Sequence, residues 1–337
     1  MKIAIDCRYL GRSGIGRVTE GILENLDFSQ NEYWLIGKRA SLEKYEGAHI
    51  VEDDSDPYSV RGLFSFPKEL NKVCDAVFLP NFLVPFGIRL PVYAIMHDLA
   101  FLDVKETTKG TPDRLIKRTL LKRCMKRAKE ISCVSAFTKE RCKLYYGKLA
   151  AKCFVNYNGI SQSVASYARS HAVPEKADEI VYVGNVKPHK GLKTLLAAFS
   201  RLEGETKLKI IGEKEHFLTG LDLDESAYRN VEFTGRLSDE ELLPAIARAK
   251  YLVLPSVYEG FGLPPLEALV LGTQPIVSEI PVFREVYEGL PVVFFRGEEG
   301  LTRALSRPPE AIGCREEVLS RYSYARCART ILEHMGV

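Results

Sequence analysis

A glycine-containing loop, a predicted helix start and two glutamates follow a short apolar run in the second half of the chain. Residues 251–254 (Tyr-Leu-Val-Leu) predict a buried strand, and a loop containing Glu259, Gly260 and Gly262 comes after it. Prolines at 264–265 predict the first turn of a helix, where a missing backbone N–H costs nothing. Because a helix N-terminus presents free N–H groups and a partial positive charge, this stretch predicts an anionic ligand.

Two acidic residues flank this loop. Glu259 lies on the loop, and Glu267 lies about one turn inside the predicted helix. They cannot form a touching carboxylate pair, so we expect them to reach two different polar groups of one elongated ligand. The alternative is an ordinary strand-to-helix turn with a solvated glutamate.

The same stretch resembles the signature of a large glycosyltransferase family, the retaining enzymes of GT-B fold known as group 1 or family 4. The signature is Pro-Ser-x-x-Glu-Gly-Phe-Gly-Leu-x-x-x-Glu-Ala, with its two glutamates in a Glu-x7-Glu spacing. All of its fixed positions are present here: Pro255, Ser256, Glu259, Gly260, Phe261, Gly262, Leu263, Glu267 and Ala268. The resemblance implies that Glu259 holds hydroxyls of a donor sugar, that the backbone of residues 260–263 meets sugar and phosphate, and that Glu267 binds the nucleotide ribose.

A basic turn before another predicted helix is the second candidate anion site. Lys187, His189 and Lys190 lie in the segment 184–191, after a predicted strand at 179–183. The turn predicts an anion site or, alternatively, a solvated basic turn. No Gly-Lys-Ser/Thr is present, which excludes a nucleoside-triphosphate P-loop.

The resemblance implies that Lys190 contacts the diphosphate of the donor. Asn185 stands where the family often has an arginine, so the second phosphate contact departs from the family pattern. Lys187, His189 or Arg236 could replace that arginine.

Two further candidates lie in the first half of the chain. Gly14 and Gly16 follow the first predicted strand at too great a distance, and without a third glycine, for a dinucleotide fingerprint. The resemblance makes them a glycine loop beside the donor, and a plain helix cap is the alternative. His97 follows a predicted strand at 91–96, and the resemblance implies a hydrogen bond from it to the donor sugar. A metal site at His97 and Asp98 is disfavoured, because no third ligand has a suitable spacing.

Helix 112–129 is basic. Its cations alternate with apolar residues at helical spacing: Arg114, Lys117, Arg118, Lys122, Arg123, Lys126, Arg127 and Lys129. They predict either a solvated face or docking on an anionic membrane surface. Nucleic acid is disfavoured, because no base-reading feature accompanies the charges.

Composition limits the class of protein. The chain of 337 residues is long enough for two domains, and a net charge of +3 does not by itself indicate nucleic acid binding. Eight cysteines contain no Cys-x-x-Cys pair, so neither a zinc site nor a disulfide framework is expected, and a reducing compartment is favoured. No apolar run is long enough to span a membrane. We therefore expect a cytoplasmic protein, with peripheral membrane association possible through the basic helix.

Strand-like and helix-like runs alternate along the whole chain, which is typical of parallel α/β sheets. We predict two Rossmann-like domains facing across a cleft: an acceptor domain at 1–168 and a nucleotide-sugar donor domain at 169–313. We expect a helix over 314–337 to pack back on the first domain. Other expectations are one helix over 60–72 and a linker over 159–177.

These features predict a retaining, metal-independent glycosyltransferase that uses a nucleotide-diphosphate sugar and no cofactor. The expected acceptor is a glycan or a lipid-linked molecule in cell-surface polysaccharide synthesis, and the N-terminal segments resemble bacterial mannosyl- or rhamnosyltransferases. The alternatives are an epimerase or phosphorylase of the same fold, or a regulator that only binds sugar nucleotides.

Overall fold

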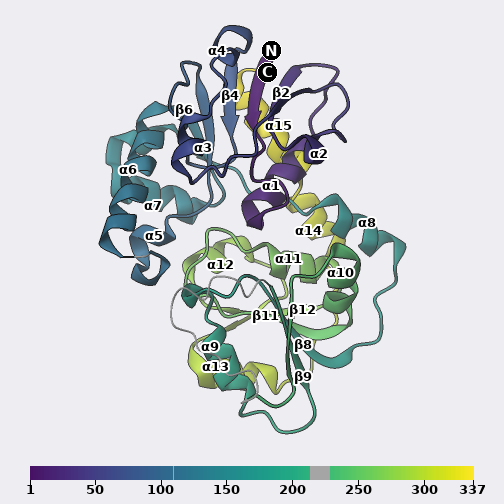
Figure 1. The fold of residues 1–337 in the computed structure, drawn as a ribbon. Coiled ribbons are helices and arrows are strands. Elements are labelled where there is room, and N and C mark those ends of the chain that lie inside the picture. Colours follow the sequence, from purple (N-terminus) through teal and green to yellow (C-terminus); the bar gives the residue numbers. More distant parts are fainter. Residues whose placement is uncertain (109, 213–227) are drawn as a thin grey trace. The chain divides into compact units, whose positions relative to one another are not determined.

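The chain folds into two α/β units, each built on one parallel sheet (Figure 1). The computed structural model describes residues 1–108, 110–212 and 228–337. The N-terminal unit consists of Met1–Leu102, Lys109–Gly159 and Tyr322–Val337, and the C-terminal unit of Asp103–Thr108 and Ile160–Arg321. These two parallel-sheet units confirm the predicted pair of Rossmann-like domains of the GT-B fold.

The sheet of the N-terminal unit has seven strands in the order β3-β2-β1-β4-β5-β6-β7. Their bounds are β1 (Lys2–Asp6), β2 (Glu32–Gly37), β3 (His49–Glu52), β4 (Ala76–Leu79), β5 (Val92–Met96), β6 (Ala128–Cys133) and β7 (Cys153–Val155). The associated helices are α1 (Ser13–Leu23), α2 (Arg39–Leu42), α3 (Val60–Phe64), α4 (Leu70–Val73), α5 (Ala100–Asp103), α6 (Thr111–Arg127), α7 (Ala136–Tyr146), η2 (Gly147–Lys152) and α15 (Tyr324–Met335).

The sheet of the C-terminal unit has six strands in the order β10-β9-β8-β11-β12-β13. Their bounds are β8 (Ala177–Val183), β9 (Lys207–Ile211), β10 (Val231–Gly235), β11 (Ala249–Leu254), β12 (Gln274–Ser278) and β13 (Val293–Phe295). The helices described in this unit are η1 (Lys105–Thr107), α8 (Gln162–Ser170), η3 (Pro188–Lys190), α9 (Leu192–Phe199), α10 (Asp239–Arg248), α11 (Leu263–Val270), α12 (Pro281–Val286), α13 (Gly297–Leu305) and α14 (Arg315–Arg321).

Each sheet has one point where the chain reverses its direction of growth. In the N-terminal unit this point lies between β1 and β4, and in the C-terminal unit between β8 and β11. Two crossovers leave such a point on opposite faces, so a crevice opens at the carboxyl ends of the two strands. These positions are where a ligand site is expected.

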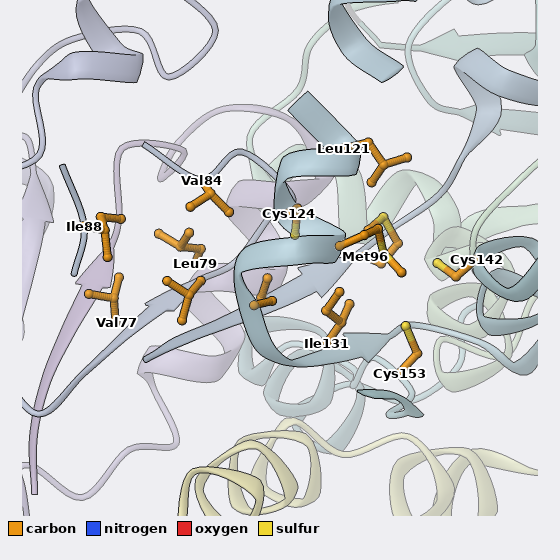
Figure 2. Close-up of a cluster of buried hydrophobic side chains, with 14 of the residues drawn as sticks. Val77, Leu79, Val84, Ile88, Met96, Leu121, Cys124, Ile131, Cys142 and Cys153 are labelled. Carbon is orange, nitrogen blue, oxygen red and sulfur yellow. The ribbon is translucent and has the colours of Figure 1, made fainter. Parts of the chain in front are cut away.

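The core of the N-terminal unit fills the space between its sheet and α6. Figure 2 shows Val77 of β4, Met96 of β5 and Ile131 of β6 on the sheet, with Leu121 and Cys124 of α6 in the same cluster. All five side chains are buried. Strands covered on both faces read as continuous apolar runs, which is why the sequence predicts them well.

Two predicted elements in the interior of the chain differ from the structure. Residues 60–72 form two short helices, α3 and α4, with Pro67 between them, because proline disfavours helical backbone at the preceding residue. The predicted linker 159–177 contains α8, whose N-cap Ser161 accepts a hydrogen bond from the Val164 amide. Its buried face includes the small residues Ala165 and Ala168, so the apolar content of the segment is low.

The C-terminal segment also differs from the prediction. Residues 314–335 form α14 and α15 rather than one helix, because Ser323 caps a new helix by accepting from the Arg326 amide. Of the two, α14 belongs to the C-terminal unit, and the N-terminal unit takes up the chain again at Tyr322. A capping box formed by Ser238 and Glu241 opens α10.

Candidate functional site in the C-terminal unit

Two loops meet at the carboxyl ends of the neighbouring strands β8 and β11. The first runs from Gly184 through η3 to α9, and the second runs from Pro255 to the start of α11. The backbone amide of Val257 donates to the carbonyl of His189 at 2.8 Å, so the loops are joined directly. Both predicted anion-binding turns therefore form one site at the reversal point of the sheet.

An ion pair lies at the centre of this site. Lys190 Nζ is 2.7 Å from Glu259 Oε1 and 2.8 Å from Oε2, and Ser256 Oγ donates to Oε1 at 2.7 Å. The Lys190 and Glu259 side chains are 21% and 11% exposed, so both are largely buried yet reachable from solvent. The sequence predicts both residues as ligand contacts, but it does not predict that they bind each other.

Glycine is required at two places in these loops. Gly191 has φ +69°, and a Cβ added there would lie 2.0 Å from the carbonyl oxygen of Pro255. Gly262 caps α11 with φ +94°, and a Cβ there would lie 2.4 Å from the Tyr287 hydroxyl. That hydroxyl instead donates to the Gly262 carbonyl at 2.7 Å. Both left-handed conformations are ones that side-chain-bearing residues rarely adopt.

The remaining signature residues lie along the start of α11. Glu267 is only 4% exposed, inside the helix, and Gly260 and Phe261 are buried in the loop before it. Leu263 is half-buried at the first helical position. The predicted helix start is confirmed, with Pro264 and Pro265 in the first turn.

Two predicted phosphate contacts lie on the surface of the same unit. Asn185 is exposed, and its carbonyl accepts from the Tyr182 hydroxyl at 3.2 Å. Burial, followed by the nearby Glu259 carboxylate, raises the pKa of Tyr182, so this hydroxyl remains a hydrogen-bond donor. Arg236 is exposed and follows β10, which is separated from β8 by β9. Asn185 thus lies at the reversal point, whereas Arg236 lies two strands away.

The N-terminal unit places His97 at the carboxyl end of β5, next to β4. Its Nε2 is 2.8 Å from the carbonyl oxygen of Pro80, which follows β4. Burial lowers the pKa of His97, an effect partly opposed by this hydrogen bond and by Asp98. Because a carbonyl can only accept, neutral His97 carries its proton on Nε2 and leaves Nδ1 as an acceptor.

Gly14 and Gly16 do not form a loop. Both lie in the first turn of α1, which begins at Ser13. The prediction of a glycine loop at these positions is therefore wrong. A Cβ at Gly16 would lie 2.3 Å from the Tyr9 carbonyl oxygen, whereas one at Gly14 would meet nothing within 4 Å. Gly16 therefore allows α1 to approach the turn after β1.

One polar residue of this region was not identified from the sequence. Arg8 is 7% exposed and pairs with Asp6 at 2.7 Å and with Asp53 at 3.3 Å. Its guanidinium also donates to Ser55 and to the Gly62 carbonyl. Arg8 thus fixes the segment 53–65 at the carboxyl end of β1. Its position directly after a buried strand was the only available signal.

The basic helix α6 uses part of its charge internally. Arg123 donates to the Val84 and Pro85 carbonyls, Arg127 donates to the Ile88 carbonyl, and Lys117 pairs with Asp113. The exposed cations of the helix are Arg118, Lys122, Lys126 and Arg127. Across residues 1–108, 110–212 and 228–337, no helix is both long and apolar enough to cross a membrane.

Comparison with known proteins agrees with this architecture. Residues 164–289 match the family model "Glycosyl transferases group 1". The O-antigen chain mannosyltransferase RfbU of Salmonella typhimurium is 29% identical over 259 residues, which are 72% of each chain. The glycogen synthase of Mycobacterium tuberculosis is 34% identical over 155 residues, 44% of this chain but 37% of that enzyme.

Solved structures match over the full length. Anabaena HepE in complex with UDP-glucose has a TM-score of 0.75 at 15% identity and covers 100% of this chain and 99% of its own. The lipopolysaccharide outer core galactosyltransferase WaaB has a TM-score of 0.68 at 20% identity, covering 99% and 100%. Both likenesses concern the fold. The family match at residues 164–289 and the similarity to RfbU support a glycosyltransferase, and the two solved structures support its GT-B fold.

Proposed function

We propose that this protein is a retaining, metal-independent glycosyltransferase that moves a sugar from a nucleoside-diphosphate sugar to a glycan or lipid-linked acceptor. The observation that carries this proposal is the Lys190–Glu259 pair at the reversal point of the C-terminal sheet. The pair offers a cation for a diphosphate and a carboxylate for sugar hydroxyls within one reachable site. A bound donor would separate the two charges and engage each with its own partner.

The chemistry follows from where charge develops. The bond between the anomeric carbon and the diphosphate oxygen breaks, and its electron pair leaves with the diphosphate. Lys190 and the backbone amides at the start of α11 stabilise that charge as fixed donors. The acceptor hydroxyl oxygen forms the new bond on the same face, and its proton passes to the leaving phosphate. No metal is required, because these groups supply the positive charge.

Other residues orient the donor. We assign Glu267 to the ribose, the backbone of Gly260 to Leu263 to sugar and phosphate, and Asn185 and Arg236 to the outer phosphate. His97 contributes Nδ1 as an acceptor for a sugar hydroxyl, since its Nε2 proton is committed to the Pro80 carbonyl. We also assign Gly14 and Gly16, in the first turn of α1, to donor binding.

The relatives support the substrate class. RfbU is named as a mannosyltransferase of the O-antigen chain, and HepE was solved with UDP and with UDP-glucose. We therefore propose a donor of the nucleoside-diphosphate hexose class, mannose or rhamnose in particular, and an acceptor in cell-surface polysaccharide synthesis. All eight cysteines are free thiols, in keeping with a cytoplasmic location.

We further propose that α6 holds the enzyme on the inner face of an anionic membrane. Leu115 and Ile116 on this helix are 62% and 59% exposed, beside the exposed Arg118, Lys122 and Lys126. Apolar side chains among exposed cations favour an interfacial position at an anionic bilayer.

The test begins with thermal-shift screening of UDP-, GDP-, ADP- and dTDP-sugars, followed by incubation of the best ligand with a panel of glycan and lipid-linked acceptors. Transfer to any acceptor supports the proposal. Tight donor binding without transfer or hydrolysis across a broad panel would instead identify a sugar-nucleotide-binding regulator. Conversion of the donor sugar without an acceptor would identify an epimerase.

A further inference from the structure

Three cysteines from neighbouring elements of the chain meet in the core of the N-terminal unit. Cys133 is the last residue of β6, Cys142 lies in α7, and Cys153 is the first residue of β7. Their sulfur atoms all lie within 4.8 Å of one another. This cluster is not predicted from the sequence, because no two of the residues have the spacing of a metal-binding motif.

The topology explains why the three side chains converge. In the parallel pairing of β6 with β7, Ile131 is opposite Cys153 and Cys133 is opposite Val155. Because residues two positions apart share a face of a strand, Cys133 and Cys153 point to the same face of the sheet. Helix α7 packs on these strands and supplies Cys142. Figure 2 shows Cys142 and Cys153 around the interior that Met96 also lines.

The cluster is closed to water and consists of soft ligands. Cys133 and Cys142 are 0% exposed and Cys153 is 4% exposed. The described residues contribute no carboxylate or histidine to this cluster. Met96 of β5 is directly opposite Cys133 in the sheet, which places a thioether next to the three thiols. Thiolate and thioether ligands select Cu(I) and zinc over hard cations such as magnesium.

We propose that Cys133, Cys142 and Cys153 form a binding site for one soft metal ion, and that Cu(I) fits it best. Metal–sulfur bonds of about 2.3 Å place two sulfur ligands of one ion at most about 4.6 Å apart, close to the upper limit of 4.8 Å in the cluster. Zinc in structural sites takes four protein ligands, whereas Cu(I) is also satisfied by three thiolates. A small contraction of the cluster completes such a site.

Binding replaces the thiol protons by the metal and releases them to solvent, so no oxidant is needed. The bound ion would tie β6, α7 and β7 together and stabilise the N-terminal unit.

The test uses the full chain carrying Cys314→Ala, since Cys314 is the one cysteine of the eight that is not buried and could bind metal adventitiously. The reduced protein is prepared without oxygen and titrated with Cu(I) against a colorimetric Cu(I) chelator. Parallel titrations use Zn²⁺ and Mg²⁺. Cys142→Ala and Cys153→Ala remove ligands, and Cys74→Ala is the matched control, being a buried cysteine of the same core.

We expect one Cu(I) per chain, weakened at least about 100-fold by either ligand variant and unchanged in Cys74→Ala. Cu(I) should also raise the thermal unfolding temperature of the parent and of Cys74→Ala only. If Cys142→Ala does not fold, Cys142→Val keeps the core filled and takes its place. Uptake of Zn²⁺ that depends on the same three cysteines would support the site and identify zinc, rather than Cu(I), as its ion.

Three results would overturn the proposal. One is metal uptake that is the same in all variants, and another is an equal thermal shift with Mg²⁺. The third is a disulfide between two of the three cysteines, seen as a loss of two hydrogens by mass spectrometry in air, together with no metal uptake by the reduced protein.

Discussion

At the scale of single residues, the proposed function depends on two opposite charges, Lys190 and Glu259, that pair with each other in the structure. A carboxylate accepting from a lysine and from a hydroxyl is well satisfied, so Glu259 is held in place before any ligand arrives. The effect of replacing Glu259 depends on whether its side chain contacts the bound substrate or mainly the transition state. A group that acts mainly as the glycosidic bond breaks affects turnover more than binding.

We expect Glu259→Gln to lower turnover roughly 10- to 150-fold, since a hydrogen bond to a charged group contributes about 1.5–3 kcal/mol. The affinity for the free nucleoside diphosphate should change less than about threefold, because the residue is assigned to the sugar. Glu298→Gln, an exposed glutamate of the same unit, is the control. Steady-state kinetics and calorimetry give the two numbers. Equal losses of turnover and of diphosphate affinity would contradict the assignment.

For Glu267 we expect the opposite result, a loss of affinity for the nucleoside diphosphate. It is buried in α11 and is assigned to the ribose, so Glu267→Ala should weaken binding of the free nucleoside diphosphate roughly 10- to 150-fold. Calorimetry on a variant whose thermal unfolding has been measured separates loss of the contact from loss of the fold. Unchanged affinity in a folded variant would remove this role.

The sequence predicted Glu259 and Lys190 as ligand contacts, but it did not predict that they pair with each other. Glu259 and Lys190 are 69 positions apart, and only the adjacency of β8 and β11 brings them together. Arg8 was missed for the same reason, since its partners Asp53 and Ser55 lie on a distant segment. Sequence spacing carries information about neighbours on one element, and these contacts cross between elements.

At the scale of elements, the sheet determines the site and the loops depend on a few glycines. The strands were predictable because parallel strands buried on both faces are continuous apolar runs. Helix α8 and the break between α14 and α15 were not predictable. Each depends on one serine N-cap, and the polar residues around that serine resemble a loop. Gly14 and Gly16 were mistaken for a loop, since glycine also permits a close approach inside a helix.

Gly191→Ala should destabilise the C-terminal unit by about 2 kcal/mol or more, because it adds a left-handed alanine and a clash with the Pro255 carbonyl. Gly289→Ala is the matched control: its φ is +77°, but nothing lies within 4 Å of the added Cβ. The difference between the two urea midpoints isolates the clash. Equal midpoints would show that the two loops are not in contact.

For α6, Arg118, Lys122 and Lys126 changed together to Glu should release the protein from anionic vesicles. Each cation near such a surface contributes about 1 kcal/mol, so the triple variant should bind roughly 100-fold more weakly at low salt. Arg123 and Arg127 are kept because they donate to backbone carbonyls. Lys38, Lys68 and Lys72, exposed on the same unit, are reversed as the control. A wild-type protein that never co-sediments with the vesicles would leave α6 as a solvated face.

At the scale of the whole molecule, the chain builds two units from segments that are not contiguous. The sequence predicted two α/β domains, and the division by contacts falls after Gly159 and after Arg321 rather than at 168 and 313. The shift arises because α8 and α14 each pack on α11 of the C-terminal unit. Residues 159–177 were predicted as a linker because they are rich in Ser, Ala and charged residues, so the packing of α8 was not expected.

We propose that the protein transfers a sugar with retention at the anomeric carbon. The most direct measurement incubates the wild-type protein with its best-binding sugar nucleotide and a working acceptor, in the presence of a chelator, and determines the anomeric configuration of the product by NMR. The account predicts transfer that is unaffected by the chelator and a product with the configuration of the donor. A product of inverted configuration would contradict it.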